Sequence, residues 1–347
     1  GDDDGRVDMA AFLFREIDAA CGGPGIWPHR SRLAAGVPAA ATNDKRPNGS
    51  FVVVDDYITL GARDCSGTQA LEVNVFAHET GHVLGLPDYY DSSSGILRQQ
   101  RRWVVGCWEI MSAGSWGCGS GPQPSAMLPP HFGAYTKMLF GWITPQIITT
   151  VGLKPQEITL HPANSTGDAV RINLSFNEYL FVEYRKQQGF DAGLPASGIL
   201  VYHVETGRAF LPCPTCPRTW SYRTVEADGD SALVRQELEG GNRGAAGDAW
   251  GVSRTVLDDT TIPSTKLNTG VSSFVRLSRM VIDAAQGVAR VTISLVPSNL
   301  TIERLVAGLG MNPVTPVDRI RLDAAGNGND RYDVGDFRAY LKIRSAD

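Results

Sequence analysis

Apolar residues in the first half of the chain repeat at helical spacing in one segment. Residues 68–84 begin with a helix-capping threonine, and one stripe recurs at offsets of 0, 4, 7 and 11. Its members are Leu71, Val75, His78 and His82. Side chains four residues apart lie one turn apart on the same helix face. The pattern predicts a helix over 68–84 that ends at Gly85 and presents both histidines together.

The segments around this helix are less regular. Residues 9–20 are apolar enough for a strand or a helix, and residues 51–60 are typical of a strand. Glycine, serine and proline dominate residues 106–124, which indicates irregular backbone there. Residues 130–139 are expected to form a second helix.

After about residue 149 the pattern changes to the two-residue alternation of β-strands. The alternating stretches are residues 170–174, 179–184, 199–204 and 288–295. His203 lies in one of them, where we expect a polar neighbour in the sheet. Residues 297–298 are typical of a linker, and short helices with a loop rich in Asn, Asp and Gly follow it. We therefore expect three domains, at residues 1–149, 150–297 and 298–347.

Composition argues against two classes of protein. The 347 residues carry a formal net charge of −5, so the chain has no basic footprint for nucleic acid. Its longest apolar runs, such as residues 199–204, fall far short of the ~20 residues that a membrane-spanning helix needs. We expect neither a nucleic-acid partner nor a membrane span.

Cysteine usage indicates an oxidising compartment. The six cysteines, an even number, are Cys21, Cys65, Cys107, Cys118, Cys213 and Cys216. Such a set favours a secreted, disulfide-bonded chain over a cytosolic one with buried thiols. Cys213 and Cys216 form a single C-x-x-C among prolines, which favours a small loop disulfide over a zinc knuckle or a redox pair.

The predicted helix contains an H-E-x-x-H sequence, His78-Glu79-Thr80-Gly81-His82. Both imidazoles can reach one metal ion, and Glu79 lies beside it, where a carboxylate can take a proton from a bound water molecule. The alternative is a helix with two histidines in polar surface contacts. The rarity of the motif argues against this alternative.

The residues after this motif offer a third ligand. Gly85 permits a sharp left-handed turn, and Asp88 follows it, which extends the motif to H-E-x-x-H-x-x-G-x-x-D. Two imidazoles and one carboxylate leave one position open for water, as in a catalytic zinc site. Asp91 is the competing carboxylate, and a simple turn role is the alternative for Asp88.

Met111 is expected to lie beneath the metal ligands as an apolar floor. An extended motif followed by such a methionine is the arrangement of metzincins, which carry a Met-turn under the zinc. Cys107 and Cys118 bracket this turn, and a disulfide between them would pin it, with Cys21–Cys65 as the other long-range bridge. A methionine in the ordinary core is the alternative.

Several segments along the chain share one resemblance. They are GDDDG at 1–5 with Val7-Asp8, IWPHR at 26–30, VDDY at 54–57, the block 78–91, EIMS at 109–112, residues 137–143, FVEYR at 181–185, SGILVYHV at 197–204 and VEADG at 225–229. In these segments the chain resembles the M6, or immune inhibitor A-like, family of secreted metallopeptidases. The resemblance implies zinc at His78, His82 and Asp88, with Glu79 as the base.

The expected fold class is α+β. The resemblance implies a metzincin-like zinc peptidase domain followed by a β-rich, sandwich-like domain, and a small helical module of EF-hand or dockerin type ends the chain. Members of the family usually begin with a propeptide and an earlier part of the catalytic domain. We therefore expect the catalytic domain to be N-terminally incomplete and the sequence to start inside a longer protein.

Acidic segments at both ends favour calcium. Near the N-terminus, the candidates are Asp2, Asp4 and Asp8, which resemble the tail of a calcium loop. Near the C-terminus, the EF-hand or dockerin-type candidates are Asp323, Asn327, Asn329, Asp333 and Asp336. A stabilising calcium module is the expected role, docking to a cohesin-like scaffold partner is secondary, and a solvated acidic turn is the alternative.

Together these features predict a secreted bacterial zinc endopeptidase that acts on protein or peptide substrates and carries structural calcium. The alternative is a calcium-dependent surface-binding or adhesion protein whose peptidase site is vestigial. The intact H-E-x-x-H motif argues against that alternative.

Overall fold

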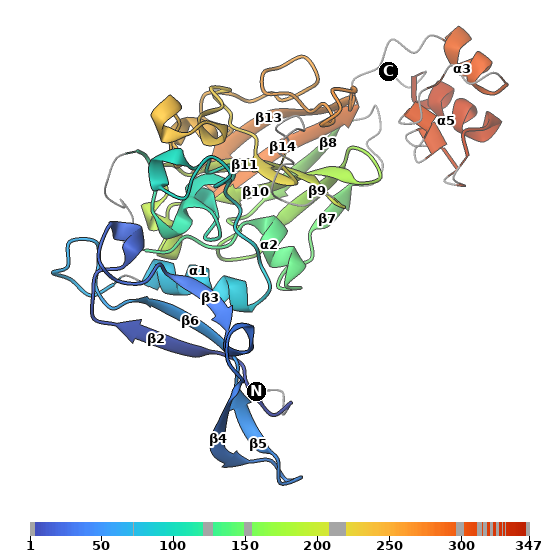
Figure 1. Ribbon diagram of the computed structural model, residues 1–347. Helices are drawn as coiled ribbons and strands as arrows, with labels where there is room; N and C mark the ends of the chain where they lie inside the picture. The colour runs from blue at the N-terminus through green and yellow to red at the C-terminus, as the bar shows by residue number, and fades with distance from the viewer. Residues whose placement is uncertain are drawn as a thin grey trace. The chain divides into compact units, whose positions relative to one another are not determined.

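The computed structural model describes residues 4–71, 73–120, 128–148, 155–207 and 220–295, and parts of residues 302–344 (Figure 1). Asp2, Cys213 and Cys216 lie outside the described residues. The chain divides into two compact units, and later segments return to the first of them. The first unit comprises Gly1–Phe132, Phe190–Leu194 and Val234–Gly244; the second comprises Gly133–Gly189, Pro195–Leu233 and Ala245–Asp347.

A three-stranded sheet supports the helix of the first unit that carries the H-E-x-x-H motif. β6 (Asp56–Gly61) is its central strand, with β2 (Ala10–Phe14) parallel on one side and β3 (His29–Arg32) antiparallel on the other. The apolar segment 9–20 therefore contains a strand rather than a helix. α1 (Val73–Val83) packs against β6 and β3, as Figure 1 shows.

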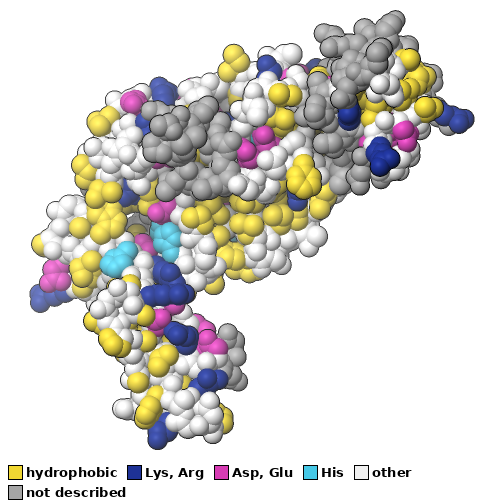
Figure 2. Space-filling view, turned by 45° about the vertical axis from the view of Figure 1, so that its right-hand side comes forward, with side chains coloured by type: hydrophobic (Ala, Val, Ile, Leu, Met, Phe, Trp, Pro, Cys, Tyr) yellow, Lys and Arg dark blue, Asp and Glu magenta, His cyan; other side chains and the backbone are white. Residues whose placement is uncertain are grey.

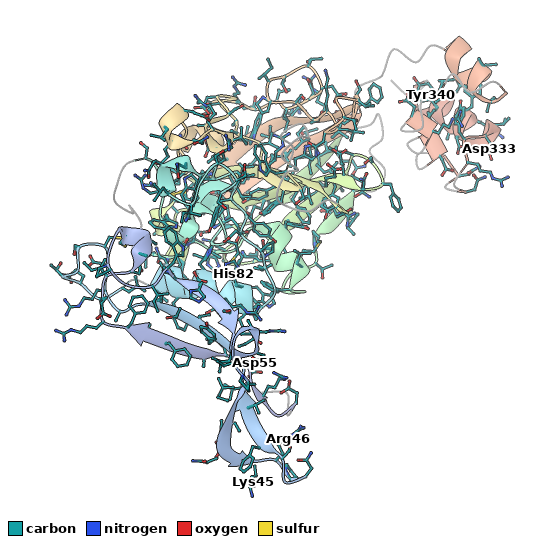
Figure 3. All side chains as sticks on the ribbon, viewed as in Figure 1. Lys45, Arg46, Asp55, His82, Asp333 and Tyr340 are labelled. Atoms are coloured by element: carbon teal, nitrogen blue, oxygen red, sulfur yellow. A yellow bond between two sulfur atoms is a disulfide. The ribbon has the colours of Figure 1, made fainter. Side chains whose placement is uncertain are left out.

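A second small sheet joins the first at Asp55. β5 (Phe51–Val54) pairs in parallel with β1 (Arg6–Val7) and antiparallel with β4 (Ala40–Lys45). The single strand predicted over 51–60 is thus two strands in two sheets. Asp55, labelled in Figure 3, is buried between them, and its carboxylate accepts a hydrogen bond of 2.9 Å from the Ala34 amide. This bond holds the chain where it passes from one sheet to the other.

Helix α1, which carries the H-E-x-x-H motif, is shorter than the helix predicted over 68–84. Residues 64–69 form a tight turn instead, in which the Gly67 amide donates to the Asp64 carbonyl at 3.0 Å. The Gln69 amide donates to the Asp64 carboxylate at 3.2 Å. Cys65 in this turn is disulfide-bonded to Cys21. The helix consequently begins five residues later than Thr68.

Irregular backbone follows residues 78–91, as the sequence indicates. Two short 3₁₀ turns, Gly106–Trp108 and Ala113–Ser115, are buried, and a disulfide joins Cys107 to Cys118. The helix predicted at 130–139 is α2 (Ala134–Leu139), which starts after an extended Gly133.

Two β-sheets, a mixed one and an antiparallel one, form most of the second unit. The larger sheet has the strand order β12 (Tyr222–Thr224), β11 (Gly198–Glu205), β10 (Glu178–Arg185), β9 (Ala169–Asn173), β7 (Gln146–Ile148), with β7 parallel to β9. The smaller sheet has the order β13 (Val275–Asp283), β14 (Val288–Leu295), β8 (Gln156–Leu160). The four stretches predicted to alternate are strands β9, β10, β11 and β14.

One apolar core fills the space between these two sheets. It includes Ile172, Val182 and Val201 from the larger sheet and Leu277 and Val291 from the smaller one. All eight residues of β10 are buried, because α2 packs on this strand. The molecule is therefore sheet-rich with few helices, in agreement with a peptidase domain plus a β-rich domain.

The C-terminal segment contributes two helices to the described chain, α3 (Ile302–Gly308) and α5 (Val334–Arg344). Leu305, Val314 and Leu322 form a small core there, with three aromatic side chains packed against it. The Tyr332 hydroxyl donates to the Leu305 carbonyl at 3.0 Å. Among the described residues, no helix is both long and apolar enough to cross a membrane.

Candidate metal centre

α1 presents the two motif histidines with the same hydrogen-bonding pattern, although their rings are nearly perpendicular. The Nδ1 atom of His78 lies 2.9 Å from the Ile110 carbonyl oxygen, and that of His82 lies 2.8 Å from the Leu86 carbonyl oxygen. Because each Nδ1 donates its proton to a carbonyl, each Nε2 carries a free lone pair. Backbone carbonyls therefore fix both rings in the state that a metal ion requires.

Asp88 brings a carboxylate to the same point. Its Oδ1 atom lies 3.1 Å from the His78 Nε2 and 3.3 Å from the His82 Nε2. The return of the chain depends on Gly85, whose φ of 96° is in the left-handed region, and on a 3.0 Å hydrogen bond from the Leu86 amide to the Gly81 carbonyl. The three ligand atoms lie within 4.8 Å of one another.

The structure places Asp91 elsewhere. Its backbone pairs with that of Arg102, and its Oδ2 atom lies 3.5 Å from the Arg102 guanidinium. Its other carboxylate oxygen accepts a 2.8 Å hydrogen bond from the Ser93 amide. Asp88 is therefore the carboxylate that the fold brings to the histidines.

This donor set fits a divalent cation. Two lone-pair nitrogens face a buried carboxylate oxygen that accepts no hydrogen bond from the described residues. Three converging acceptors without a proton between them repel one another unless a positive ion lies at their centre. Two imidazoles with one carboxylate match zinc and leave a coordination position open.

Glu79 faces the same space from α1. Its side chain is buried, and its Oε2 atom accepts no hydrogen bond from any described residue. Burial raises the pKa of the Glu79 carboxyl above its ordinary value. A carboxyl that holds and releases a proton closer to neutral pH is suited to general acid–base chemistry.

Met111 packs against the helix of the motif at Gly81. It is fully buried, and a Cβ atom added at Gly81 would lie 2.3 Å from its sulfur. The Met111 carbonyl accepts a 2.8 Å hydrogen bond from the Tyr89 amide, and the preceding Ile110 carbonyl accepts the His78 proton. The methionine turn thus supports both the helix and the ligand loop.

The centre opens into a cavity of about 880 Å³ within the first unit. Besides the metal-site residues, its walls include His29, Arg30, Tyr90, Arg101 and Trp116. Figure 2 shows histidine side chains close to acidic and basic groups on one face, and Figure 3 labels His82 on α1. A cavity of this size accommodates a peptide side chain and its neighbours.

Tyr90 and Arg101 are not among the residues that the sequence singles out. The Tyr90 ring stacks on His78 with centroids 6.3 Å apart. Burial raises the pKa of Tyr90, so that its hydroxyl stays neutral and bonds to the Asp88 carboxylate. Their positions in the sequence, two residues and thirteen residues past Asp88, carry no periodic signal, although an aromatic residue beside a ligand loop is a hint.

The C-terminal calcium candidates also come together. The Asn327 amide donates to Asp336 at 3.0 Å, the Asn329 amide donates to Asp323 at 2.8 Å, and the side chain of Asn329 donates to Asp333 at 2.9 Å. At the N-terminus, Asp4 accepts a hydrogen bond from the Arg6 amide. Calcium binding at either end stays a prediction.

One acidic cluster of the second unit is not anticipated by the sequence. Glu226, Asp228 and Asp230 each place a carboxylate oxygen within 4.8 Å of the others. Burial and the charge of Asp248 raise the pKa of Glu226 to about 8. Glu226 also accepts a 3.1 Å hydrogen bond from the Leu233 amide.

The fold and the centre define a class. A helix that carries H-E-x-x-H, a carboxylate returned by a glycine turn and a buried methionine beneath them are the parts of a metallopeptidase. Residues 2–143 match the family model described as immune inhibitor A peptidase M6, catalytic domain. In these residues the chain is similar to the catalytic domain of the M6 peptidase family.

Curated proteins show the same similarity. The chain is 30% identical over 190 residues to the pre-pro-metalloprotease PrtV of Vibrio cholerae serotype O1, strains M66-2 and ATCC 39315 / El Tor Inaba N16961, which covers 49% of this chain and 19% of each relative. It is 30% identical over 146 residues to immune inhibitor A of Bacillus thuringiensis subsp. alesti, which covers 40% of this chain and 20% of the relative. The matched region thus spans about a fifth of the length of these relatives.

Proposed function

We propose that the protein is a zinc-dependent endopeptidase that hydrolyses peptide bonds of protein substrates. One observation carries the proposal: two histidine Nε2 atoms and the Asp88 carboxylate converge beside the buried carboxylate of Glu79. The similarity of residues 2–143 to a peptidase family supports the reaction class.

Each residue of the centre has a distinct role in this proposal. His78, His82 and Asp88 hold the ion, which supplies the Lewis acidity that lowers the pKa of water and polarises a carbonyl. Glu79 takes a proton from the attacking water molecule and delivers it to the leaving amine. Tyr90 holds Asp88 in place through its hydroxyl, and the carbonyls of the methionine turn and of Leu86 hold the imidazoles.

We further propose that the protein acts outside the cell. Disulfides Cys21–Cys65 and Cys107–Cys118 support this, because disulfides persist in oxidising compartments. The relatives named above are metalloproteases of bacteria, or an immune inhibitor of a bacterium, by their descriptions. The three-domain division at 1–149, 150–297 and 298–347, with a dockerin-like calcium module at the end, remains part of the proposal.

Cleavage of a quenched-fluorescence peptide library tests this function. Zinc-loaded protein should cleave, and Glu79→Gln should lower the turnover by at least about a thousandfold while it keeps zinc, because the base is lost and the ligands stay. Glu157→Gln, which changes a surface carboxylate of β8, is the matched control. Unchanged turnover in Glu79→Gln would refute the assignment of the base.

A folded, zinc-loaded protein that cleaves no peptide of the library would overturn the endopeptidase proposal. The calcium-dependent binding or adhesion function would then account better for the chain. Calcium-dependent retention on a cell surface, measured with the same preparation, would be its positive sign.

A further inference from the structure

Arg101 is a buried arginine in the wall of the cavity that holds the metal centre. The residue is 3% exposed. Its guanidinium carbon lies 4.7 Å from the ring centroid of Tyr90 and 5.4–5.7 Å from those of Trp27, Trp103 and Trp116. Four aromatic rings therefore fix the position of one positive charge.

This charge has no counter-ion in the described part of the chain. The Arg101 Nε donates to the Ile96 carbonyl at 2.9 Å, and no described carboxylate lies within ion-pair distance of the guanidinium. Ring faces attract a cation without neutralising it. A buried charge that lacks an opposite charge is costly to the fold.

Neighbouring arginines of the same unit are paired. Arg102 lies 3.5 Å from the Asp91 carboxylate, and Arg243 lies 3.1 Å from that of Glu237. Arg30 lines the same cavity as Arg101, but it forms an ion pair with Asp56. Arg101 differs from these arginines because no carboxylate of the described residues pairs with it, so a negatively charged partner must come from elsewhere.

We propose that Arg101 makes this cavity a binding site for a substrate carboxylate, and that the peptidase prefers peptides with an acidic group next to the scissile bond. A guanidinium offers two parallel N–H donors that match the two oxygens of a carboxylate. The surrounding rings keep water away, which strengthens the interaction. The carboxylate comes from an Asp or Glu side chain or from the C-terminus of the substrate.

This inference rests on the proposed peptidase function, since it names the chemistry of that enzyme's substrate. It also explains why the fold retains an unpaired charge near its catalytic centre. Buried polar groups that break the pairing rule are expected where a ligand completes them.

The test uses pairs of peptides built on the best sequence from the cleavage library. Each pair differs only by Glu or Gln at one position, from three residues before to three residues after the scissile bond. A second set compares a free C-terminal carboxylate with its amide. One position, or the free C-terminus, should raise kcat/KM by roughly tenfold or more, as expected for a charged hydrogen-bonded pair.

Variants of Arg101 locate the effect. Arg101→Met keeps an apolar chain between the rings and should reduce the Glu-to-Gln ratio to about one, while Arg101→Lys should keep part of it. Arg30→Met is the matched control, because it removes a paired arginine from the same cavity and should leave the ratio unchanged. An unchanged ratio in Arg101→Met would overturn the proposal.

Binding gives a readout independent of turnover. Calorimetric titration of the zinc-loaded Glu79→Gln protein with the same peptide pairs should reproduce the preference as a ratio of Kd values. If Arg101→Met fails to fold, the wild-type ratio still decides: cleavage with equal Glu, Gln, acid and amide rates overturns the carboxylate site. Failure to cleave any peptide overturns the proposed function instead.

Discussion

Histidines in the two units have different surroundings. In the second unit, His203 has partners on both ring nitrogens: Nε2 lies 2.8 Å from the Glu178 carboxylate, and Nδ1 lies 3.3 Å from the Arg223 guanidinium. In the first unit, the Nδ1 atoms of His78 and His82 each donate to a backbone carbonyl, and their Nε2 atoms face the Asp88 carboxylate, which is also an acceptor. His78 and His203 are both buried, so burial does not separate the two kinds of histidine. The nitrogen left without a hydrogen-bond donor marks the candidate metal ligand.

The largest effect should come from removing one histidine of each kind. His82→Ala removes a ligand and should abolish stoichiometric zinc and lower turnover by at least about a thousandfold. His203→Ala should retain zinc, but it should lower the free energy of unfolding by about 3 kcal/mol, because the buried Glu178 carboxylate loses its ion pair with His203. Zinc analysis and urea unfolding of both variants measure the two effects.

The opposite pattern would contradict the comparison. A His82→Ala protein with stoichiometric zinc would show that His82 is not a ligand. Loss of zinc from His203→Ala at unchanged stability would show that the second unit also holds the ion.

The same contrast explains how much of the site could be predicted. Sequence spacing places His78, Glu79 and His82 on one helix, because that relation is local. The glycine turn to Asp88 is also local, so the preferred third ligand is the carboxylate that the fold brings to the histidines. Arg101 escaped prediction, because its surroundings combine rings from separate segments, Trp27, Tyr90 and Trp116.

The same division between local and long-range features applies to the prediction of the fold. Strands β9, β10, β11 and β14 are recognisable, because apolar and polar residues alternate in them. The recruitment of residues 190–194 and 234–244 into the first unit was not predictable, since it rests on contacts distant in sequence. One such contact is the 2.6 Å hydrogen bond from the Cys107 amide to the Arg243 carbonyl.

Buried carboxyl groups extend the comparison to pH. Glu79 faces a cavity, whereas Glu226 lies in an acidic cluster, where burial and Asp248 raise its pKa to about 8 from an ordinary value of 4.5. The folded state therefore holds a proton that the unfolded chain releases between these two pKa values. The free energy of unfolding should fall on the order of a few kcal/mol as pH rises from about 4.5 to about 8.

Urea unfolding at several pH values, with a chelator present, measures this dependence. Glu226→Gln should flatten the profile, because an amide does not titrate. A wild-type profile that rises over the same interval would contradict the raised pKa of Glu226.

The smallest effect concerns the packing beneath the metal centre. Gly81→Ala adds a Cβ atom 2.3 Å from the Met111 sulfur, so either the helix or the methionine must shift. We expect the free energy of unfolding to fall by about 1–3 kcal/mol, although alanine favours a helix. Gly36→Ala is the matched control, because a Cβ atom there meets nothing within 4 Å and its φ of −137° suits any residue.

A double variant isolates the contact itself. In the Met111→Ala background there is room for the added Cβ atom. Gly81→Ala should therefore lower the free energy of unfolding by less than it does when Met111 is present, with a coupling energy of about 0.5–3 kcal/mol. Equal costs in both backgrounds would mean that Met111 does not press against α1. Because Gly81 lies between Glu79 and His82, a shift of the helix should also lower turnover, whereas relocation of the Met111 side chain alone should leave turnover unchanged.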